Sequence, residues 1–238
     1  MSTKTAFVTG ANKGIGFETA KALLKYGFRV LIGARDESRG TAAVEALAEF
    51  GDVQLQLIDM ADLDSIRAAV SNVKENYADL TLLINNAGIS GAFDKTAWDF
   101  EAQELIDTYM VDFIGPFGLT KGLLPLLNDN KGKVVNITIP TEAHEFFHPF
   151  AYQAAKAPLN VMIDNFGLEV AQKNMPVQIM GIMPGAVSTD LNDHAQGDFV
   201  KTPTEAAEQI VAIATDAKNY NGKIVNVDNP EDILSRMD

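Results

Sequence analysis

Short apolar runs of strand length alternate along the chain with longer segments in which apolar residues recur every three or four positions. The first pattern is typical of buried β-strands and the second of helices with one apolar face. Seven runs are predicted to form strands, at residues 5–9, 29–34, 53–58, 80–84, 133–137, 177–183 and 223–227. Six segments are predicted to form helices, at residues 17–26, 36–50, 62–77, 97–127, 152–173 and 203–216.

This alternation predicts an α/β fold with one doubly wound parallel sheet of about seven strands and helices on both faces. No linker, repeat or low-complexity tract interrupts it, so we expect a single domain over residues 1–238. Gly115-Pro116 is expected to kink the long helix 97–127. Pro158 removes one hydrogen bond from the helix 152–173.

Composition narrows the classes of partner. The formal net charge of −13 and the pI of about 4.6 disfavour nucleic acid and anionic membranes. The absence of Cys excludes disulfides, thiolate metal sites and a Cys nucleophile. No apolar run reaches 18 residues, and the first residues lack the apolar core of a signal peptide. We therefore expect a cytoplasmic protein that binds neither membrane nor nucleic acid.

The first strand is followed at once by a glycine-rich turn and a helix. Gly10, Gly14 and Gly16 frame Asn12 and Ile15 in a G-x-x-x-G-x-G spacing. Glycines let the backbone approach a pyrophosphate, and the N-terminus of the next helix offers it free N–H groups. A plain turn between a strand and a helix remains the alternative, but the context favours a dinucleotide site.

The second strand ends without the acid that would bind a ribose 2′-hydroxyl in an NAD site. Ala34 stands at its end and Arg35 follows, where a guanidinium suits a 2′-phosphate. Lys13, in the glycine turn, could add a second positive charge. The alternative is two solvated surface cations. In so acidic a chain we expect NADP(H) to be favoured over NAD(H).

Tyr152 and Lys156 lie four residues apart, so on a helix they share one face. A Lys charge beside a Tyr stabilises the phenolate and lowers the phenol pKa toward a value useful for proton transfer. The alternative for this common pair is a half-buried Tyr and a solvated Lys.

Taken together, these motifs resemble the short-chain dehydrogenase/reductase family over essentially the whole chain. Thr9–Gly16 is similar to its TGxxxGxG turn, Asn85–Gly88 to its NNAG stretch, Tyr152 and Lys156 to its YxxxK pair, and Pro184–Thr189 to its PGxVxT stretch. Residues 34–40 resemble the NADPH-dependent carbonyl reductases of that family. The resemblance implies a Rossmann-type fold. It also implies cofactor contacts at Gly10, Asn12, Lys13, Gly14, Ile15, Gly16, Arg35, Asp59, Met60, Asn86, Ala87, Gly88, Tyr152, Lys156, Pro184, Gly185, Val187 and Thr189.

Two positions depart from the family pattern. The family's catalytic Ser, thirteen residues before the Tyr, is Ile139 here. Its neighbour Thr138 carries a hydroxyl, but successive strand residues point to opposite faces. Thr138, Thr141 and His144 are the candidates to replace the Ser. Loss of one such donor could cost on the order of 10²–10³ in rate.

The family's catalytic Asn, which orders a water joining the Lys to a proton relay, corresponds to Asp112. An Asp could order the same water, but as an anion near Lys156. The resemblance therefore implies Tyr152 as general acid/base, Lys156 as its activator and Asp112 as the third catalytic residue.

His144 to His148 spells the H-E-x-x-H pattern of zinc proteases, which needs both His on one helix face. Pro140 and Pro149 bracket it within ten residues, so we expect no metal site. Instead, Phe146, Phe147 and Phe150 make an apolar or aromatic substrate plausible, with ordinary packing as the alternative. The loop 188–202 would share in specificity.

Two functions follow. The first is an NADP(H)-dependent oxidoreductase acting on a small-molecule carbonyl or alcohol. The second is a nucleotide-binding protein with little turnover, a redox sensor or scaffold, which Ile139 and Asp112 favour and the intact Tyr152 and Lys156 disfavour.

In the resembled family, the helices that carry the counterparts of Asp112 and Tyr152 commonly pair across twofold axes. This chain lacks the insertion before the Tyr that marks monomeric carbonyl reductases, so we expect a homodimer or homotetramer.

Overall fold

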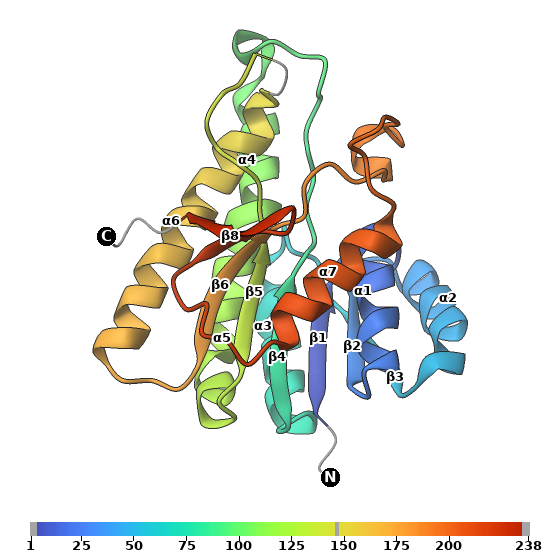
Figure 1. Ribbon diagram of the computed structural model, residues 1–238. Helices are drawn as coiled ribbons and strands as arrows, with labels where there is room; N and C mark the ends of the chain where they lie inside the picture. Colours follow the sequence, from blue (N-terminus) through green and yellow to red (C-terminus); the bar gives the residue numbers. More distant parts are fainter. Residues whose placement is uncertain (1–3, 146–147, 235–238) are drawn as a thin grey trace.

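A sheet of eight strands in the order β3-β2-β1-β4-β5-β6-β7-β8 forms the centre of the computed structural model, which describes residues 4–145 and 148–234 (Figure 1). The first seven strands are parallel: β1 Thr5–Thr9, β2 Arg29–Ala34, β3 Val53–Leu57, β4 Leu80–Asn85, β5 Lys133–Ile137, β6 Gln178–Met183 and β7 Ile224–Asn226. The predicted doubly wound parallel sheet is thus confirmed. An eighth strand, β8 Asn229–Leu234, pairs antiparallel with β7 and was not predicted.

Helices cover both faces of this sheet (Figure 1). The helices are α1 Gly14–Lys25, α2 Glu37–Leu47, α3 Leu63–Asn76, α4 Ala102–Tyr109, α5 Gly115–Asp129, α6 Phe150–Gln172 and α7 Pro203–Thr215. One core packs α1, α2 and α7 against the sheet, for example through Leu23, Leu47 and Ile210. The other core packs α3, α5 and α6, for example through Leu123 and Val170. Each face is therefore closed by apolar side chains that the helical period predicts.

The predicted long helix 97–127 differs from the observed one. Residues Ala97–Asp99 form a separate short 3₁₀ turn, and the helix begins at Ala102. A π-helical turn, Met110–Ile114, joins α4 to α5 directly before the expected kink at Gly115-Pro116. Such turns insert one extra residue and are frequent at functional sites. Pro158 sits inside α6, which remains continuous.

The stretch Ala102–Asp129 is long and apolar enough to cross a membrane by length and composition alone. Its buried side chains, among them Leu119, Leu123 and Leu127, belong to the protein core, and a core helix meets the same criterion.

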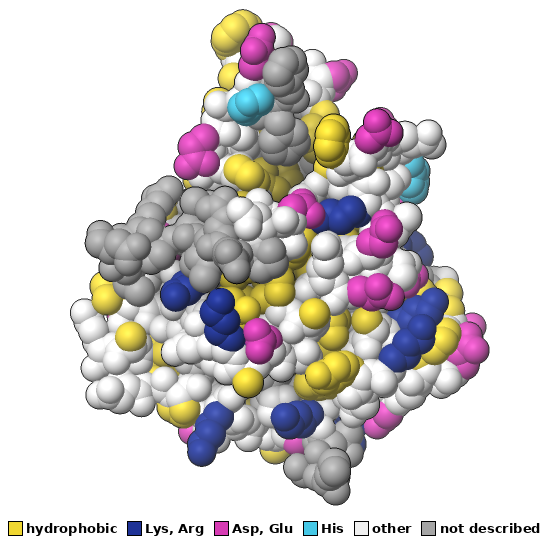
Figure 2. Space-filling model, in the orientation of Figure 1, with side chains coloured by type: hydrophobic (Ala, Val, Ile, Leu, Met, Phe, Trp, Pro, Cys, Tyr) yellow, Lys and Arg dark blue, Asp and Glu magenta, His cyan; other side chains and the backbone are white. Residues whose placement is uncertain are grey.

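On the molecular face shown in Figure 2, Lys and Arg side chains are interspersed with Asp and Glu.

The chain winds in one direction from β1 to β3 and in the other from β4 onward. In such sheets ligands bind beyond the carboxyl ends of the strands, where this order reverses. Here that point lies between β1 and β4. Buried amides brace the sheet next to it, since Asn85 Nδ2 donates to Asn136 Oδ1 at 2.9 Å and Asn136 Nδ2 donates to Met180 O at 3.2 Å.

Candidate active site

A cleft of about 540 Å³ opens at this reversal point. Most of the predicted cofactor residues line it: Gly10, Asn12, Lys13, Gly14, Ile15, Gly16, Arg35, Asp59, Met60, Asn86, Ala87, Gly88, Tyr152 and Thr189. Lys156, Pro184, Gly185 and Val187 are not among the described residues that line it. The structure therefore brings residues from β1, β2, β4, α6 and the loop after β6 to one cavity.

The glycine turn holds one end of this cleft. Gly10 has a φ of 65°, and a Cβ there would come within 2.8 Å of Ala87 Cα, so the turn and the segment after β4 touch through backbone. Helix α1 begins at Gly14 with no acidic side chain in its first turn. Its free N–H groups and positive dipole end make this an anion-binding position.

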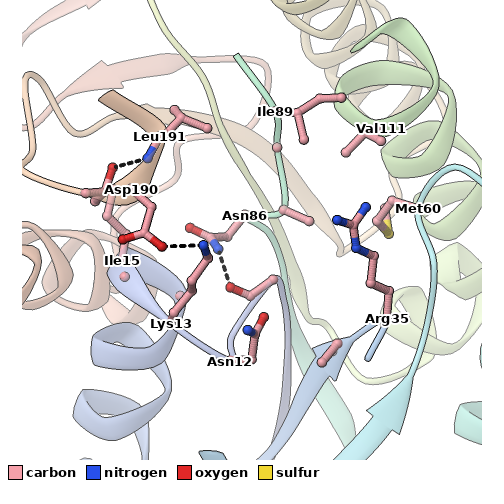
Figure 3. A pocket seen from close by; sticks show the side chains of 18 of the residues that line it. Asn12, Lys13, Ile15, Arg35, Met60, Asn86, Ile89, Val111, Asp190 and Leu191 are labelled. Atoms are coloured by element: carbon pink, nitrogen blue, oxygen red, sulfur yellow. Dashed lines mark hydrogen bonds and ion pairs between the residues drawn. The ribbon is translucent and has the colours of Figure 1, made fainter. Parts of the chain in front are cut away.

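The segment after β4 is fixed to the glycine turn by hydrogen bonds. The backbone N–H groups of Asn86 and Ala87 donate to Thr9 Oγ1 at 3.0 and 3.1 Å. Asn86 Nδ2 donates to the carbonyls of Thr9 and Gly10 at 2.9 and 3.3 Å, and its side chain stands at the centre of the cleft (Figure 3). These bonds hold the two loops at a fixed spacing.

On the β2 side, the Arg35 guanidinium points into the cleft beside Met60 (Figure 3). Arg39 also lines the cleft but pairs with Asp36, whose carboxylate accepts the Arg39 N–H at 2.8 Å and caps α2. Asp59 lines the same side, and its Oδ1 accepts the Ala61 N–H at 2.9 Å. Of the two arginines on this side, Arg39 is ion-paired, whereas Arg35 has no ion-pair partner among the described residues.

Lys13, which could add a second positive charge to the cleft, is ion-paired in the structure. Its ammonium forms an ion pair with Asp190 across the mouth of the cleft (Figure 3). Asp190 also faces His194 Nε2 at 3.0 Å, and the Lys13 ammonium, by hydrogen bond and charge, holds the pKa of this carboxyl below its usual value. The residues are 177 positions apart in sequence, so no local pattern could have predicted the pair.

The loop after β6 brings Asp190 to this position. Gly185 turns with a φ of 75°, Val187 bridges to Lys201, and Val187 O accepts a bond from Asn192 Nδ2 at 3.0 Å. Ser90 Oγ donates to Leu191 O at 3.2 Å from the opposite side. Pro184, Gly185 and Val187 thus shape the loop, and Thr189 lines the cleft itself.

Tyr152 and Lys156 form the other end of the site, one turn apart on α6. Tyr152 is 8% exposed and lines the cleft, whereas Lys156 is 2% exposed. The Lys156 ammonium lies 5.3 Å from the centre of the Tyr152 ring and donates to Ile137 O at 3.1 Å. The alternative of a solvated Lys is excluded by this burial.

Asp112, on the π-helical turn, is completely buried and ion-paired with Lys156, with 3.0 Å between Oδ1 and Nζ. Its other oxygen, Oδ2, accepts the Ile89 N–H at 3.0 Å. Burial raises the pKa of Asp112, while Lys156 and this N–H oppose the rise. For Lys156, burial lowers the pKa, but the charges of Asp112 and Tyr152 win and raise it above its ordinary value.

The expected lowering of the Tyr152 pKa is not seen in the free chain. Burial of the phenol raises its pKa, Lys156 pulls it down, and Asp112 pushes it up again, with a net rise. Desolvation disfavours the charged phenolate, and the sequence could not show how deeply the ring is buried.

The family model for short chain dehydrogenases matches residues 4–198. The chain belongs to the short chain dehydrogenase family. It is 28% identical to the 3-oxoacyl-(acyl-carrier-protein) reductase of Chlamydia trachomatis, over 94% of this chain and 96% of that protein. It is 39% identical to the NADPH carbonyl reductase 3 of Mus musculus, over 57% of this chain and 48% of that protein.

Solved structures agree in fold. The NADPH-bound carbonyl reductase from chicken fatty liver superimposes with a TM-score of 0.85 at 22% identity, over 96% of this chain and 98% of that one. The resemblance to carbonyl reductases within the short chain dehydrogenases is therefore confirmed.

This short chain dehydrogenase has no hydroxyl at position 139. Ile139 is half-buried, and its carbonyl accepts from Asn160 Nδ2 at 3.4 Å. Thr138 is fully buried, and its Oγ1 donates to Asn160 Oδ1 at 2.6 Å. Its hydroxyl is thus engaged with α6, and Thr138 is not among the described residues that line the cleft. Thr141 and His144 are not among the cleft-lining residues.

The H-E-x-x-H pattern does not form a helix where it is described. Phe146 and Phe147 lie outside the described residues. His148 Nδ1 lies 3.0 Å from His144 O, and both His are exposed. Among the described residues, no group of three or more His, Cys, Asp or Glu could hold a metal ion.

Sequence reasoning missed several residues that line the cleft. They are Gly33, Ala34, Asp36, Arg39, Ile58, Ile89, Ser90, Gly91, Val111, Ile137, Asp190 and Leu191. Most of them lie within two residues of a strand end or of a predicted site residue, so extension of each predicted site along the chain would have found them. Arg39 and Gly91 lie farther from any of these positions and carry no such signal.

Proposed function

We propose that this short chain dehydrogenase is an NADP(H)-dependent oxidoreductase that interconverts a small-molecule carbonyl and an alcohol. One observation carries the proposal: a single cleft has an anion-binding helix end and Arg35 at one end and Tyr152 beside buried Lys156 at the other. Phosphate recognition and proton transfer thus share one cavity.

The residues present fit a phosphorylated dinucleotide. The first turn of α1 carries no acid that would repel a pyrophosphate. Arg35 points into the cleft at the end of β2, where no carboxylate takes the ribose 2′-hydroxyl; the nearest acid, Asp36, is occupied by Arg39. The name of the 39%-identical mouse relative, which specifies NADPH, supports the same preference. The cofactor would supply or accept the hydride.

Tyr152 would exchange the proton with the substrate oxygen, since it is the titratable side chain that reaches the cleft from α6. Lys156 would act on it through charge, because its ammonium stays buried and bonded to Ile137 O. Asp112 would position Lys156. Four further residues are proposed to contact the cofactor although they do not line the cleft in this structure: Lys156, Pro184, Gly185 and Val187.

Aromatic rings favour an apolar or aromatic substrate. The rings of Phe100 and Phe150 contact each other at a tilt of 54°, with their centres 6.0 Å apart. Phe150 lies two residues before Tyr152 on α6. A Cβ on the cleft-lining Gly91 would lie 3.5 Å from the Phe100 ring. An apolar wall therefore adjoins the catalytic end of the cleft.

A second function is favoured by the chemistry at position 139. With Ile139 in place of Ser and Thr138 bonded to Asn160, Tyr152 is left as the principal donor to the substrate oxygen. A protein that binds NADP(H) with little turnover, as a redox sensor or scaffold, would show the same substitution.

A panel of aliphatic and aromatic aldehydes and ketones with NADPH, scored by loss of NADPH absorbance, separates the two functions. Turnover that Tyr152→Phe abolishes supports the oxidoreductase. Tight NADPH binding without turnover on any substrate supports the binding protein. Weak binding of both NADPH and NADH contradicts both functions.

We further propose that the protein is cytoplasmic and forms a homodimer or homotetramer.

A further inference from the structure

The buried pair of Asp112 and Lys156 carries an inference that rests on the proposed function. We propose that Asp112 neutralises Lys156, so that Tyr152 stays protonated through the neutral range and the site works there as a proton donor for carbonyl reduction. In this arrangement the site acts as a base for alcohol oxidation only at alkaline pH.

The geometry around Asp112 favours a carboxylate paired with the Lys156 ammonium, against the effect of burial, which raises the pKa of Asp112. Oδ2 accepts the Ile89 N–H at 3.0 Å, and Oδ1 faces the Lys156 ammonium at 3.0 Å. Oδ2 thus meets a hydrogen-bond donor, and Oδ1 meets a positive charge without a hydrogen bond of its own, so a negative charge on this carboxyl is stabilised from both sides. An Asn amide could satisfy only one of the two with its oxygen and would present its own donors to the other. The pair is therefore built for a negative charge at this position.

Close packing holds the carboxylate in place. A Cβ on Gly88 would come within 2.6 Å of Asp112 Oδ1, so the segment after β4 lies directly against it. The π-helical turn Met110–Ile114 directs Asp112 into this space. With 0% exposure for Asp112 and 2% for Lys156, little solvent screens their interaction.

The effect on Tyr152 follows from charge. Of the charged groups in the described chain, Lys156 and Asp112 are the two that act on the phenol. Lys156 alone would stabilise the phenolate that remains after the O–H bond breaks and the proton passes to the substrate oxygen. The carboxylate 3.0 Å from the ammonium offsets this stabilisation, and burial of the ring disfavours the phenolate further. Tyr152 is thus a weak acid that remains protonated over a wide pH range.

Alkaline titration of tyrosinate absorbance tests this without cofactor or substrate. The chain has five Tyr, and subtraction of the Tyr152→Phe curve isolates Tyr152. In the unaltered protein we expect a Tyr152 midpoint above the ordinary value of about 10. A midpoint below that value overturns the proposal, whatever any variant does.

Asp112→Asn should lower the Tyr152 midpoint by about one pH unit or more, because Lys156 is then uncompensated. Asp64→Asn, at an exposed acid on α3, is the matched control and should leave the midpoint in place. An unchanged or raised midpoint in Asp112→Asn, with folding verified by thermal unfolding, overturns the proposal. If that variant does not fold, the titration of the unaltered protein decides.

The pH profile of turnover separates this inference from the proposed function. If carbonyl reduction is found, the alkaline limit of kcat/KM should move to lower pH in Asp112→Asn. A limit that stays in place overturns the inference while the oxidoreductase function stands. If no carbonyl is reduced but the Tyr152 titration behaves as expected, the neutralised pair stands and the catalytic function fails.

Discussion

Thr138 Oγ1 donates a 2.6 Å hydrogen bond to Asn160 Oδ1, and both side chains are buried. This bond ties the hydroxyl of Thr138, the neighbour of position 139 in sequence, to α6, and Thr138 is not among the described residues that line the cleft. Asn160 Nδ2 in turn donates to Ile139 O, so the backbone that would carry the family's Ser is held in place. The scaffold for a Ser remains although the residue is Ile.

Ile139→Ser should therefore increase kcat on a carbonyl substrate, by up to about 10²-fold, because it restores a donor where negative charge builds up. Steady-state kinetics measure the change. Thr138→Val is the matched control: it should leave kcat nearly unchanged but destabilise the fold by about 1–3 kcal/mol, because Asn160 Oδ1 loses its donor. A lower kcat in Ile139→Ser would show that Ile139 contacts the substrate.

Tyr152→Phe should abolish turnover, since it removes the phenol proton and leaves the ring in place. The dissociation constant of NADPH should change little, because the ring stays in place and a phenol hydroxyl is not the group expected to bind the phosphates. Fluorescence titration measures binding and NADPH absorbance measures turnover. Residual turnover above about 10⁻² of the unaltered rate would show that another group donates the proton.

The sequence predicted the elements that have a period and missed those that depend on distant partners. Alternating strands and helices located β1 to β7, because buried runs and amphipathic segments are local patterns. β8 escaped because its polar stretch, with Pro230 in it, lacks strand alternation. The π-helical turn that carries Asp112 has no distinctive sequence pattern from which it could have been predicted.

The same limit applies to the site. Gly10, Arg35 and Tyr152 were found because their motifs place them at strand ends or helix faces. The pairing of Lys13 with Asp190 and the depth at which Tyr152 is buried depend on contacts between segments far apart in the chain. Spacing alone therefore predicted the effect of Lys156 on the Tyr152 pKa, but neither the ion pair of Lys13 nor the opposing effects of burial and Asp112 on Tyr152.

Arg35→Ala should reduce the preference for NADPH over NADH. A charge-assisted contact to the 2′-phosphate contributes roughly 1.5–3 kcal/mol, a factor of about 10–150 in affinity. NADH affinity should stay nearly constant, because that cofactor lacks the phosphate. Titration of both cofactors by fluorescence measures the ratio. Equal affinities in the unaltered protein, or an unchanged ratio in Arg35→Ala, would count against the assignment.

Asp190→Asn should tighten NADPH binding several-fold, because it releases Lys13 from its ion pair at the mouth of the cleft. The gain should vanish in the Lys13→Met background, and a double-mutant cycle isolates that coupling. The gain should also shrink as salt is raised, since both side chains are more than half exposed. Tighter binding that persists without Lys13 would mean that Asp190 itself repels the cofactor.

Assembly can be tested on α6 and the helix beside it. Val161 and Leu168, two turns apart on α6, are exposed by 50% and 43%. Four aromatic rings follow one another from α4 to α6 at spacings of 5.1, 6.2 and 5.9 Å: Tyr109, Phe113, Phe117 and Phe166. A row of apolar side chains along adjacent helices is suited to pair with its own copy across a twofold axis.

Val161→Glu combined with Leu168→Glu should convert the protein from a dimer or tetramer to a smaller species, because burying two carboxylates in an apolar interface is unfavourable. Light scattering coupled to size exclusion measures the mass. Tyr26→Glu is the matched control: Tyr26 is 64% exposed, lies at the end of α1, and should not affect assembly. A monomer mass for the unaltered protein at every concentration would refute the prediction, and a mass unchanged by the double variant would place the interface elsewhere.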